Sequence, residues 1–429
     1  MSISKSILYI CLGTITLKET ENAVHFALNL KRAGFSNHFL AFPFNARFIK
    51  QYGFSVDELK LSKEENYRIF TEVCKRVKPD WILIADGYLF DFWFGPKHIF
   101  DMRWILDNPV GAHFATFDNL CLSMENTTLP FYNNPNIEDK FKWLHTTDLT
   151  SVMPLLIPCP YAFSNAKFKN KKSSIFYYRR YKERLKWDEN QKKNFRNSIG
   201  LEMREKLVLF SLLEWPLQVA RVITEDLDIW LKHFSQMIEI IFQEVKEKTT
   251  LLVISPYPLF TNFSRRHLKI INWDLLSIDI YTKFLLTADL FITTSAISHS
   301  IIQAVINKVP AGCLISSGSD FRENKEIPSQ LLNWFEIGQK RYPDLLKPYL
   351  IFPIGWQEIL APILEKNPYA DTFKFLDLLN PGETINTIND LLFNSEKKKS
   401  LIQRQENYME QIAFLPGPEK IMKSLMENS

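Results

Sequence analysis

The chain has 429 residues, of which 46% are hydrophobic and 23% charged, and this composition is typical of a globular protein large enough for two domains. The formal net charge is only +4, which argues against a nucleic-acid partner, and the 13 glycines are too few for long glycine-rich phosphate loops. The five cysteines form no CxxC pair, so the sequence favours reduced thiols over a disulfide framework or a zinc site.

The chain begins with a short apolar run at 7–12, which predicts a buried β-strand and is too short for the apolar part of a signal peptide. No stretch approaches the ~20 consecutive apolar residues of a membrane span. We therefore expect a cytoplasmic protein without a transmembrane segment, while contact with a membrane surface stays open.

Strand-like and helix-like patterns then alternate along the first part of the chain. Strands are expected over 7–12, 38–42, 81–85 and 110–114, and helices over 19–32 and 63–77. This order predicts a parallel sheet covered by helices, which is a Rossmann-like domain over 1–165.

Residues 166–200 are rich in Lys and Arg with interleaved aromatic residues, and we interpret them as a linker and the opening helix of a second domain. The alternation then restarts, with strands expected over 207–212, 251–255, 290–293 and 311–315, and helices over 227–245, 279–286 and 300–307. The sequence therefore predicts a second Rossmann-like domain over 201–385, followed by C-terminal helices over 386–429.

The most informative stretch is 287–310, which combines a buried strand, a loop of small polar residues and a helix. The loop would lie at the carboxyl end of a parallel strand and at the N-terminus of a helix, where open α/β sheets bind ligands. Unpaired backbone N–H groups and the helix dipole favour an anion there. The side chains that could bind it are Ser295, Ser298, His299 and Ser300. A strand, loop and helix without any ligand are the alternative.

This stretch resembles the donor-binding segment of GT-B glycosyltransferases, and it is similar to nucleoside-diphosphate-sugar enzymes of the peptidoglycan GlcNAc-transferase type. The resemblance implies an α/β fold of two doubly wound, Rossmann-like domains that face each other across a cleft. It also implies that the C-terminal domain binds a nucleotide sugar, such as a UDP-sugar, and that the N-terminal domain binds the acceptor. The transfer would require no metal and no cofactor beyond the nucleotide sugar.

Two features of the stretch depart from the family pattern. Thr294, Ser295 and Ala296 stand where the family usually carries glycines. The ribose-binding Glu of the family corresponds to Gln303, which can bond a ribose hydroxyl only without the assistance of a charge.

The resemblance adds donor-binding candidates at the ends of other strands. Ser211 and Glu214 would face the diphosphate, Trp273 would stack on the nucleobase, and Asp320 would contact sugar hydroxyls. Ordinary strand-end residues and a buried core Trp are the alternatives.

Glycosyl transfer also needs a base that activates the acceptor. The candidates follow strands of the first domain or lie in its first helix, and they are Glu19, Glu21, His25, Asp86 and Asp118. Arg179 and Arg180 could hold an anionic acceptor or the diphosphate, unless their segment is a packed linker. The sequence contains no cluster typical of a metal site.

The sequence leaves the acceptor open between a small molecule, a peptide and a lipid. It also leaves two alternatives to a transferase. One is a nucleotide-sugar hydrolase or epimerase on the same fold, and the other is a non-catalytic nucleotide-binding or scaffold protein.

Overall fold

The computed structural model describes residues 5–13, 17–87, 99–107, 110–119, 149, 152–159, 174–181, 185, 187–202, 204–212, 227–255, 259–260, 263–265, 267–274, 276–315, 336, 364, 367–378 and 380–428. The chain forms two compact units. Unit 1 comprises Met1–Lys182, Glu358–Asn367 and Gln411–Ser429, and unit 2 comprises Glu183–Gln357 and Pro368–Glu410.

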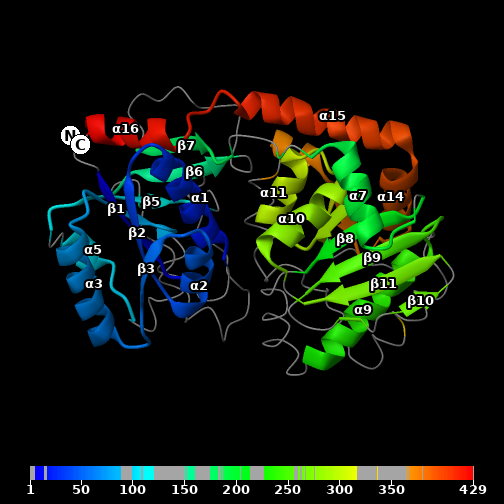
Figure 1. Cartoon of the computed structure of the whole chain (residues 1–429), viewed down its shortest axis with the longest axis horizontal. Helices are drawn as coiled ribbons and strands as arrows, with labels where there is room; N and C mark the ends of the chain where they lie inside the picture. Colours follow the sequence, from blue (N-terminus) through cyan, green and yellow to red (C-terminus); the bar gives the residue numbers. More distant parts are fainter. Residues whose placement is uncertain are drawn as a thin grey trace. The chain divides into compact units, whose positions relative to one another are not determined.

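Unit 1 contains a parallel sheet whose described strands have the order β3-β2-β1-β4-β5-β6-β7 (Figure 1). These strands are β1 (Ser6–Cys11), β2 (Ser36–Ala41), β3 (Ser55–Glu58), β4 (Trp81–Ile84), β5 (His113–Phe117), β6 (Leu155–Cys159) and β7 (Ile175–Arg179). The described helices are α1 (Lys18–Arg32), α2 (Pro43–Gln51), α3 (Lys63–Val77), α5 (Arg103–Leu106) and α16 (Pro418–Asn428).

The central strand β1 is buried on both faces because helices cover both sides of the sheet. Ile7 and Tyr9 belong to a core with residues of α1, α2 and α16, whereas Leu8 and Ile10 belong to a second core with residues of α3 and α5. The alternation follows from the period of two along a strand. It also explains why the run at 7–12 is apolar throughout.

Unit 2 contains a second sheet, with the order β10-β11-β9-β8-β12-β13-β14 among its described strands. The strands are β8 (Lys206–Ser211), β9 (Thr249–Ile254), β10 (Phe263–Arg265), β11 (Leu268–Trp273), β12 (Leu290–Thr293), β13 (Ala311–Ile315) and β14 (Lys374–Asp377), and only β10 among them pairs in the antiparallel sense. The described helices are α7 (Glu189–Ser198), α9 (Leu227–Gln243), α10 (Ile278–Thr287), α11 (His299–Ile306), α14 (Pro381–Phe393), α15 (Ser395–Ile412) and the 3₁₀ helix η6 (Pro368–Thr372).

Both sheets are doubly wound, as the sequence predicts. The strand order reverses between β1 and β4 in unit 1 and between β8 and β12 in unit 2. Ligands of open α/β sheets bind beyond the carboxyl ends of the strands at such a reversal. The topology therefore indicates that ligands bind near the loops that follow β1, β4, β8 and β12.

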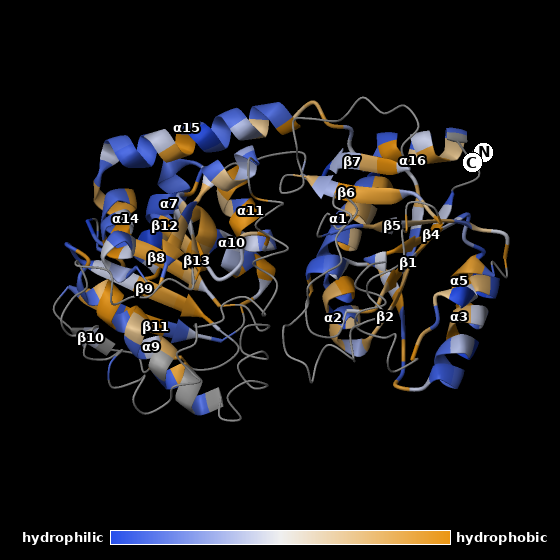
Figure 2. Cartoon of the chain, turned by 180° about the vertical axis from the view of Figure 1, so that it is seen from behind, coloured by the Kyte–Doolittle hydropathy of each residue, from blue (hydrophilic) through white to orange (hydrophobic). Residues whose placement is uncertain are grey.

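The predicted domain boundaries need two corrections. Within the predicted linker at 166–200, Ile175–Arg179 forms β7, which pairs in parallel with β6 and completes the described part of the first sheet. Within the predicted C-terminal helices, α16 packs Ile421, Met422 and Leu425 into the core of unit 1. The two C-terminal helices differ in hydropathy. Figure 2 shows that α15 is largely hydrophilic, whereas α16 carries apolar residues.

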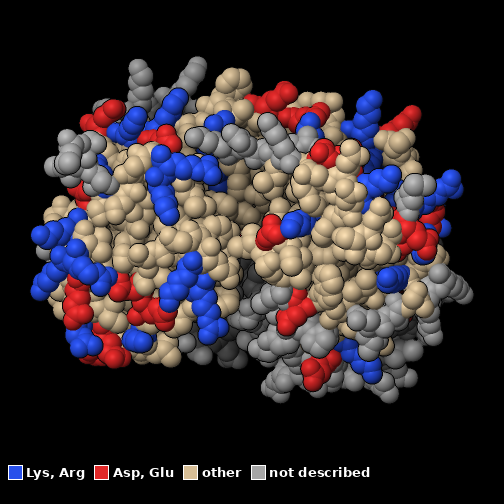
Figure 3. All heavy atoms as spheres, in the orientation of Figure 1, with Lys and Arg blue, Asp and Glu red and all other residues tan. Residues whose placement is uncertain are grey.

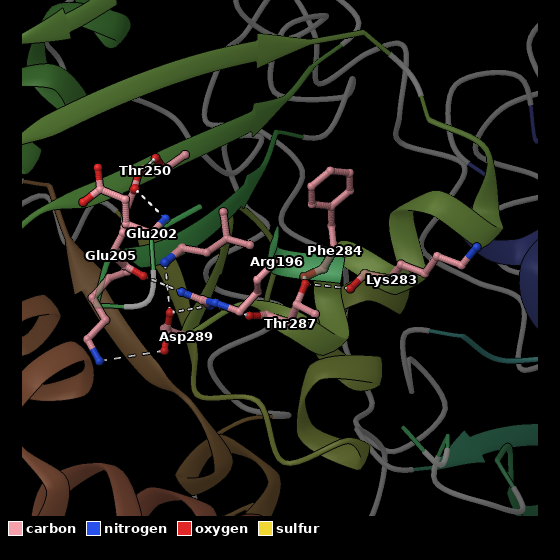
Figure 4. A network of polar contacts seen from close by, with 10 residues as sticks. Arg196, Glu202, Glu205, Thr250, Lys283, Phe284, Thr287 and Asp289 are labelled. Carbon is pink, nitrogen blue, oxygen red and sulfur yellow. Dashed lines mark hydrogen bonds and ion pairs between the residues drawn. The ribbon is translucent and has the colours of Figure 1, made fainter. Parts of the chain in front are cut away.

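A polar network holds the amino ends of β8 and β12 together (Figure 4). The Oδ2 atom of Asp289 accepts hydrogen bonds from the Leu207 N–H at 2.9 Å and from the Arg196 guanidinium at 3.0 Å. Its Oδ1 atom lies 3.9 Å from Nζ of Lys206. Arg196 also donates to the Thr287 carbonyl at 3.1 Å. The network lies at the edge opposite the strand carboxyl ends, so its role is to align strands.

Within the described residues, no helix combines the length and the apolar composition that a membrane crossing requires. Lys and Arg side chains are interspersed with Asp and Glu on the face shown in Figure 3.

Candidate functional site

The loop between β12 and α11 lies at the carboxyl edge of the sheet in unit 2. Ser298 is the N-cap of α11, and its hydroxyl accepts a hydrogen bond from the Ile301 N–H at 3.2 Å. The Ile302 N–H donates to the Ser298 carbonyl at 3.3 Å. These bonds define where the helix begins and leave the N–H groups of His299 and Ser300 in its first turn, ahead of the first intrahelical bond.

The path of this loop is fixed by buried contacts. Ala296 is fully buried, and its carbonyl accepts a hydrogen bond from the Tyr369 hydroxyl at 2.8 Å. The Ser298 N–H donates to the Ser295 carbonyl at 3.3 Å. The helix start is therefore held in place before any ligand arrives.

Two threonines at the end of β12 carry buried hydroxyls. Thr293 and Thr294 are 0% and 1% exposed, and within the described part of the chain neither hydroxyl forms a hydrogen bond. A buried polar group without a partner costs ~1–3 kcal/mol. Such atoms are therefore found where a ligand or a water molecule supplies the missing bond. The sequence analysis named neither hydroxyl as a ligand, although two consecutive threonines at the end of a buried strand were the available signal.

Five of the predicted donor-binding residues lie at the carboxyl edge of the sheet in unit 2. Ser211 ends β8 directly beside Thr293, because the two residues are register partners in the parallel pair of β8 and β12. Ser295 and Ser298 are buried, and His299 and Ser300 are half-buried at the start of α11. The topology thus brings Ser211 and the β12–α11 loop to the same edge of the sheet.

Gln303 is oriented differently from what the resemblance implies. Its Oε1 atom accepts a hydrogen bond from the Asn307 amide at 3.3 Å, one helical turn further on. A contact with a ribose hydroxyl would require this side chain to turn away from Asn307.

Trp273 is not a buried core residue. It ends β11 and is 39% exposed, with its ring edge-on to that of Phe284 at 5.0 Å between the ring centroids. Phe284 supports the indole while part of its surface stays accessible. Glu214 and Asp320, the other two predicted donor contacts, lie outside the described residues.

The acceptor-side candidates gather at the carboxyl edge of the sheet in unit 1. Glu19 and Glu21 lie in the first turn of α1, Asp86 follows β4, and Asp118 follows β5. The sequence could predict that these residues gather, because α1 begins and β4 and β5 end at the same edge of the sheet.

A buried hydrogen-bond network joins several of these elements. The Oδ2 atom of Asp86 accepts from the backbone N–H of Asn119 at 3.1 Å and from its side-chain amide at 2.9 Å. The Asn22 amide donates to the side-chain oxygen of Asn119, and Nζ of Lys18 donates to its carbonyl at 3.1 Å. Asp86 therefore joins the ends of β4 and β5. Asn119, the centre of the network, was not among the predicted residues.

Glu21 and His25 share one face of α1 with the side chain of Arg180. The Arg180 guanidinium is fully buried, 4.0 Å from the Glu21 carboxylate, and it lies over the Tyr181 ring at 4.9 Å. Burial raises the pKa of Glu21 to about 7, although Arg180 opposes the increase. Burial, reinforced by Arg180, lowers the pKa of His25 to about 3, so this imidazole is neutral at physiological pH.

The two predicted basic residues are engaged inside unit 1. Arg179 donates to the Ala413 carbonyl at 2.6 Å, and its backbone N–H donates to the Pro416 carbonyl at 2.8 Å. It therefore anchors the segment that precedes α16, while Arg180 faces Glu21. Each guanidinium would have to leave these contacts to hold an anionic substrate, and that role stays a prediction.

Within the described residues, no three His, Cys, Asp or Glu side chains are placed so that they could hold a metal ion. The expectation of a metal-independent reaction therefore stays a prediction.

The model of a family described as "Family of unknown function (DUF6365)" matches residues 26–429. No curated protein sequence matches the chain.

Solved structures share the architecture of nearly the whole chain. The glycotransferase of kitacinnamycin has a TM-score of 0.54 at 10% identity and covers 100% of this chain and 99% of its own. The spinosyn rhamnosyltransferase SpnG complexed with thymidine diphosphate has a TM-score of 0.52 at 12% identity, covering 98% and 100%. The calicheamicin glycosyltransferase CalG4 has a TM-score of 0.51 at 10% identity, covering 99% and 98%. The expected GT-B fold is confirmed, and at these identities the likeness concerns the fold alone.

Proposed function

The chain belongs to the DUF6365 family and has the GT-B fold, and on these premises we propose that it is a glycosyltransferase. It moves a sugar from a nucleoside-diphosphate sugar to the hydroxyl group of an acceptor. Unit 2 binds the donor, and unit 1 supplies the groups that act on the acceptor. We expect no metal and no further cofactor in the reaction.

The observation that carries this proposal is the arrangement after β12. The first turn of α11 presents backbone N–H groups, and the buried hydroxyls of Thr293 and Thr294 stand directly before the loop. A helix N-terminus stabilises an anion by ~0.3–1 kcal/mol when exposed, and hydroxyl donors add hydrogen bonds. A diphosphate supplies a negative charge for the helix N-terminus and acceptor oxygens for the hydroxyls of Thr293 and Thr294.

The same groups would act during the reaction as well as in binding. When the bond between the sugar and the diphosphate breaks, negative charge develops on the leaving oxygen. Donors that are already in place stabilise this charge without reorganisation. The loop is suited to this because Tyr369 and Ser298 fix it in advance.

The nucleotide is best sought among pyrimidine nucleoside diphosphates. The sequence resemblance suggests UDP, and one SpnG structure was solved with thymidine diphosphate. Another SpnG structure contains the spinosyn aglycone, which is a small-molecule acceptor. For this chain we propose a small hydroxyl compound in the cytoplasm, where its buried free cysteines would stay reduced.

Thermal unfolding with a panel of nucleoside diphosphates tests the donor site. A nucleotide at 100 times its dissociation constant adds ~2.7 kcal/mol to the free energy of unfolding, which gives a visible shift. If neither UDP, thymidine diphosphate nor any purine counterpart stabilises the protein, the proposal is wrong.

The location of the site is tested with Ser300→Glu against Ser300→Gln. A carboxylate in the first turn of a helix stabilises the helix, so the Glu variant should fold at least as well as the Gln variant. It should repel the diphosphate and weaken nucleotide binding more than Gln does, because both variants lose the Ser300 hydroxyl and only Glu adds a negative charge. Equal nucleotide affinity in the two variants would place the site elsewhere.

Product analysis separates the alternatives on the same fold. Release of free sugar or of an epimer in the absence of any acceptor would indicate a hydrolase or an epimerase. Nucleotide binding without turnover across a broad acceptor panel would indicate a binding protein.

A further inference from the structure

The acidic candidates in unit 1 differ in what their carboxylates can reach. Asp118 is fully buried, Glu19 is nearly so, and Asp86 is occupied with Asn119 at the ends of β4 and β5. The Glu21 side chain keeps 20% of its surface exposed at the carboxyl edge of the sheet. Among these acids, Glu21 combines access from solvent with a fixed position.

We propose that Glu21 is the catalytic base that takes the proton of the acceptor hydroxyl, and that Arg180 is the residue that positions it. This inference rests on the proposed glycosyl transfer and identifies the group that carries out its proton transfer.

The geometry of α1 determines where the carboxylate lies. Glu21 lies in the first turn of α1, the next described element after β1, which is one of the two strands at the reversal of strand order, and its N–H donates to the Leu17 carbonyl at 2.7 Å. Arg180 arrives from the end of β7, and its N–H donates to the Cys159 carbonyl at 3.1 Å. Because its guanidinium is fully buried and lies over Tyr181, it cannot follow Glu21 into solvent. Arg180 therefore lies against the Glu21 carboxylate from the protein interior, while part of the Glu21 side chain stays exposed to solvent.

The surroundings of Glu21 raise its proton affinity into the range that suits a base at neutral pH. Burial raises the pKa of this carboxyl to about 7, Arg180 and Lys18 oppose the increase, and Glu19 adds to it. A base is most effective when its pKa lies near the operating pH, because it is then both ionised and basic enough. His25 and Tyr52 stay neutral near physiological pH, since burial lowers the pKa of His25 to about 3 and raises that of Tyr52 to about 12.

The proton transfer and the sugar transfer together form a single displacement. The O–H bond of the acceptor breaks, and its proton moves to the Glu21 carboxylate. The acceptor oxygen forms a bond to the anomeric carbon while the bond from that carbon to the diphosphate oxygen breaks, and the diphosphate leaves with the electron pair. Glu21 then returns the proton to solvent. Because the attack is direct, the anomeric configuration inverts.

Two acceptors of different acidity test the base without knowledge of the natural acceptor. In 2-chloro-4-nitrophenol the hydroxyl is already ionised at pH 8, whereas in 4-methoxyphenol it is not. With a nucleotide sugar that the wild type uses, Glu21→Gln should lower transfer to 4-methoxyphenol by ~10²–10⁴-fold. Transfer to the nitrophenolate should stay close to that of the wild type. Glu65→Gln, an exposed Glu in the first turn of α3, is the matched control and should affect neither acceptor.

Each result has a defined meaning. If Glu21→Gln slows both acceptors equally while nucleotides still stabilise the variant, Glu21 is not the base. If nucleotides fail to stabilise the wild type, the proposed function fails instead. If Glu21→Gln does not fold, Glu21→Asp replaces it, and a shortened base should again slow 4-methoxyphenol more than the nitrophenolate.

A measurement independent of turnover completes the test. In the ¹³C NMR titration of side-chain carboxyl groups, the resonance absent from Glu21→Gln should titrate with a pKa near 7. A pKa close to the usual 4.5 would contradict the raised proton affinity of this carboxyl, and the comparison of the two acceptors decides whether it is the base. Arg180→Lys keeps the charge but not the planar guanidinium, so it should lower kcat and shift the acidic limb of the pH profile.

Discussion

The hydroxyl of Tyr369 donates a 2.8 Å hydrogen bond to the carbonyl of Ala296, so the 3₁₀ helix η6 fixes the loop that precedes α11. Both residues are fully buried. The tyrosine ring is itself packed against Tyr408, at 5.8 Å between the ring centroids. The shape of the candidate diphosphate loop in unit 2 therefore depends on residues from the C-terminal part of the chain.

Tyr369→Phe removes this hydrogen bond and little else. The buried Ala296 carbonyl loses its partner, which should lower the free energy of unfolding by ~1–3 kcal/mol in urea titrations. Because the loop loosens, the affinity for the stabilising nucleotide should also fall. Tyr67→Phe, on the exposed side of α3, is the control. An unchanged nucleotide affinity in Tyr369→Phe would mean that the loop does not bind the nucleotide.

Trp273→Ala tests the predicted stacking surface for the nucleobase. Stacking of a base on an aromatic side chain is worth ~1–3 kcal/mol, so calorimetry should show a roughly 5- to 150-fold weaker nucleotide affinity. Because Trp273 is 39% exposed, stability should change little. Trp273→Phe should retain most of the affinity. Equal binding by Trp273→Ala and wild type would remove Trp273 from the donor site.

Asp289→Asn tests the network at the opposite edge of the same sheet. The substitution leaves the partly buried Arg196 without its carboxylate, and the free energy of unfolding should fall by roughly 3 kcal/mol. In combination with Arg196→Met the loss should be less than additive, because both changes remove one interaction. Nucleotide affinity should stay unchanged. A loss of binding without a loss of stability would contradict the structural role.

Glu21 should make stability depend on pH in a defined direction. Its pKa in the folded protein is about 7 against the usual 4.5, so the folded state holds this proton more tightly than the unfolded state does. The stabilisation is fully present below pH 4.5 and is lost as the pH rises to about 7, amounting to roughly 3 kcal/mol. In Glu21→Gln this decrease should vanish. The slope with pH is the quantity to compare, because the substitution also deprives Arg180 of its carboxylate. An unchanged slope would rule out the raised pKa.

His25 should act in the opposite direction. Its pKa falls from 6.5 to about 3 on folding, so the unfolded state binds this proton more tightly. Stability is fully present above pH 6.5 and is lost as the pH falls toward 3. His25→Gln should therefore reduce acid sensitivity and move the pH of maximum stability down, whereas Glu21→Gln should move it up. Unfolding curves between pH 4 and 8 measure both shifts, and a common direction would contradict this account.

The sequence predicts the strands and helices that carry strong local patterns. The helix at 63–77 and the strands at 290–293 and 311–315 have the predicted bounds, because apolar periodicity and the residues that end each element are local signals. The sequence predicts a linker in place of β7 because the strand lies at the end of the described sheet order, where every side chain except that of Tyr178 is only partly buried, and its charged and aromatic residues lack a strand pattern.

By itself, the sequence determined the two doubly wound sheets and, through them, the carboxyl edge of each: Glu21 and Asp86 lie at that edge of the first sheet, and Ser211 and the β12–α11 loop lie at that edge of the second. Parallel strands place their carboxyl ends together, so the order of elements is sufficient for that conclusion. Only the tertiary structure decided that Arg180 faces Glu21, that Tyr369 holds Ala296, and that Gln303 bonds to Asn307. The first two pairs are far apart in the chain, and the third depends on the choice of one rotamer. Packing sets such contacts, and no local pattern records them.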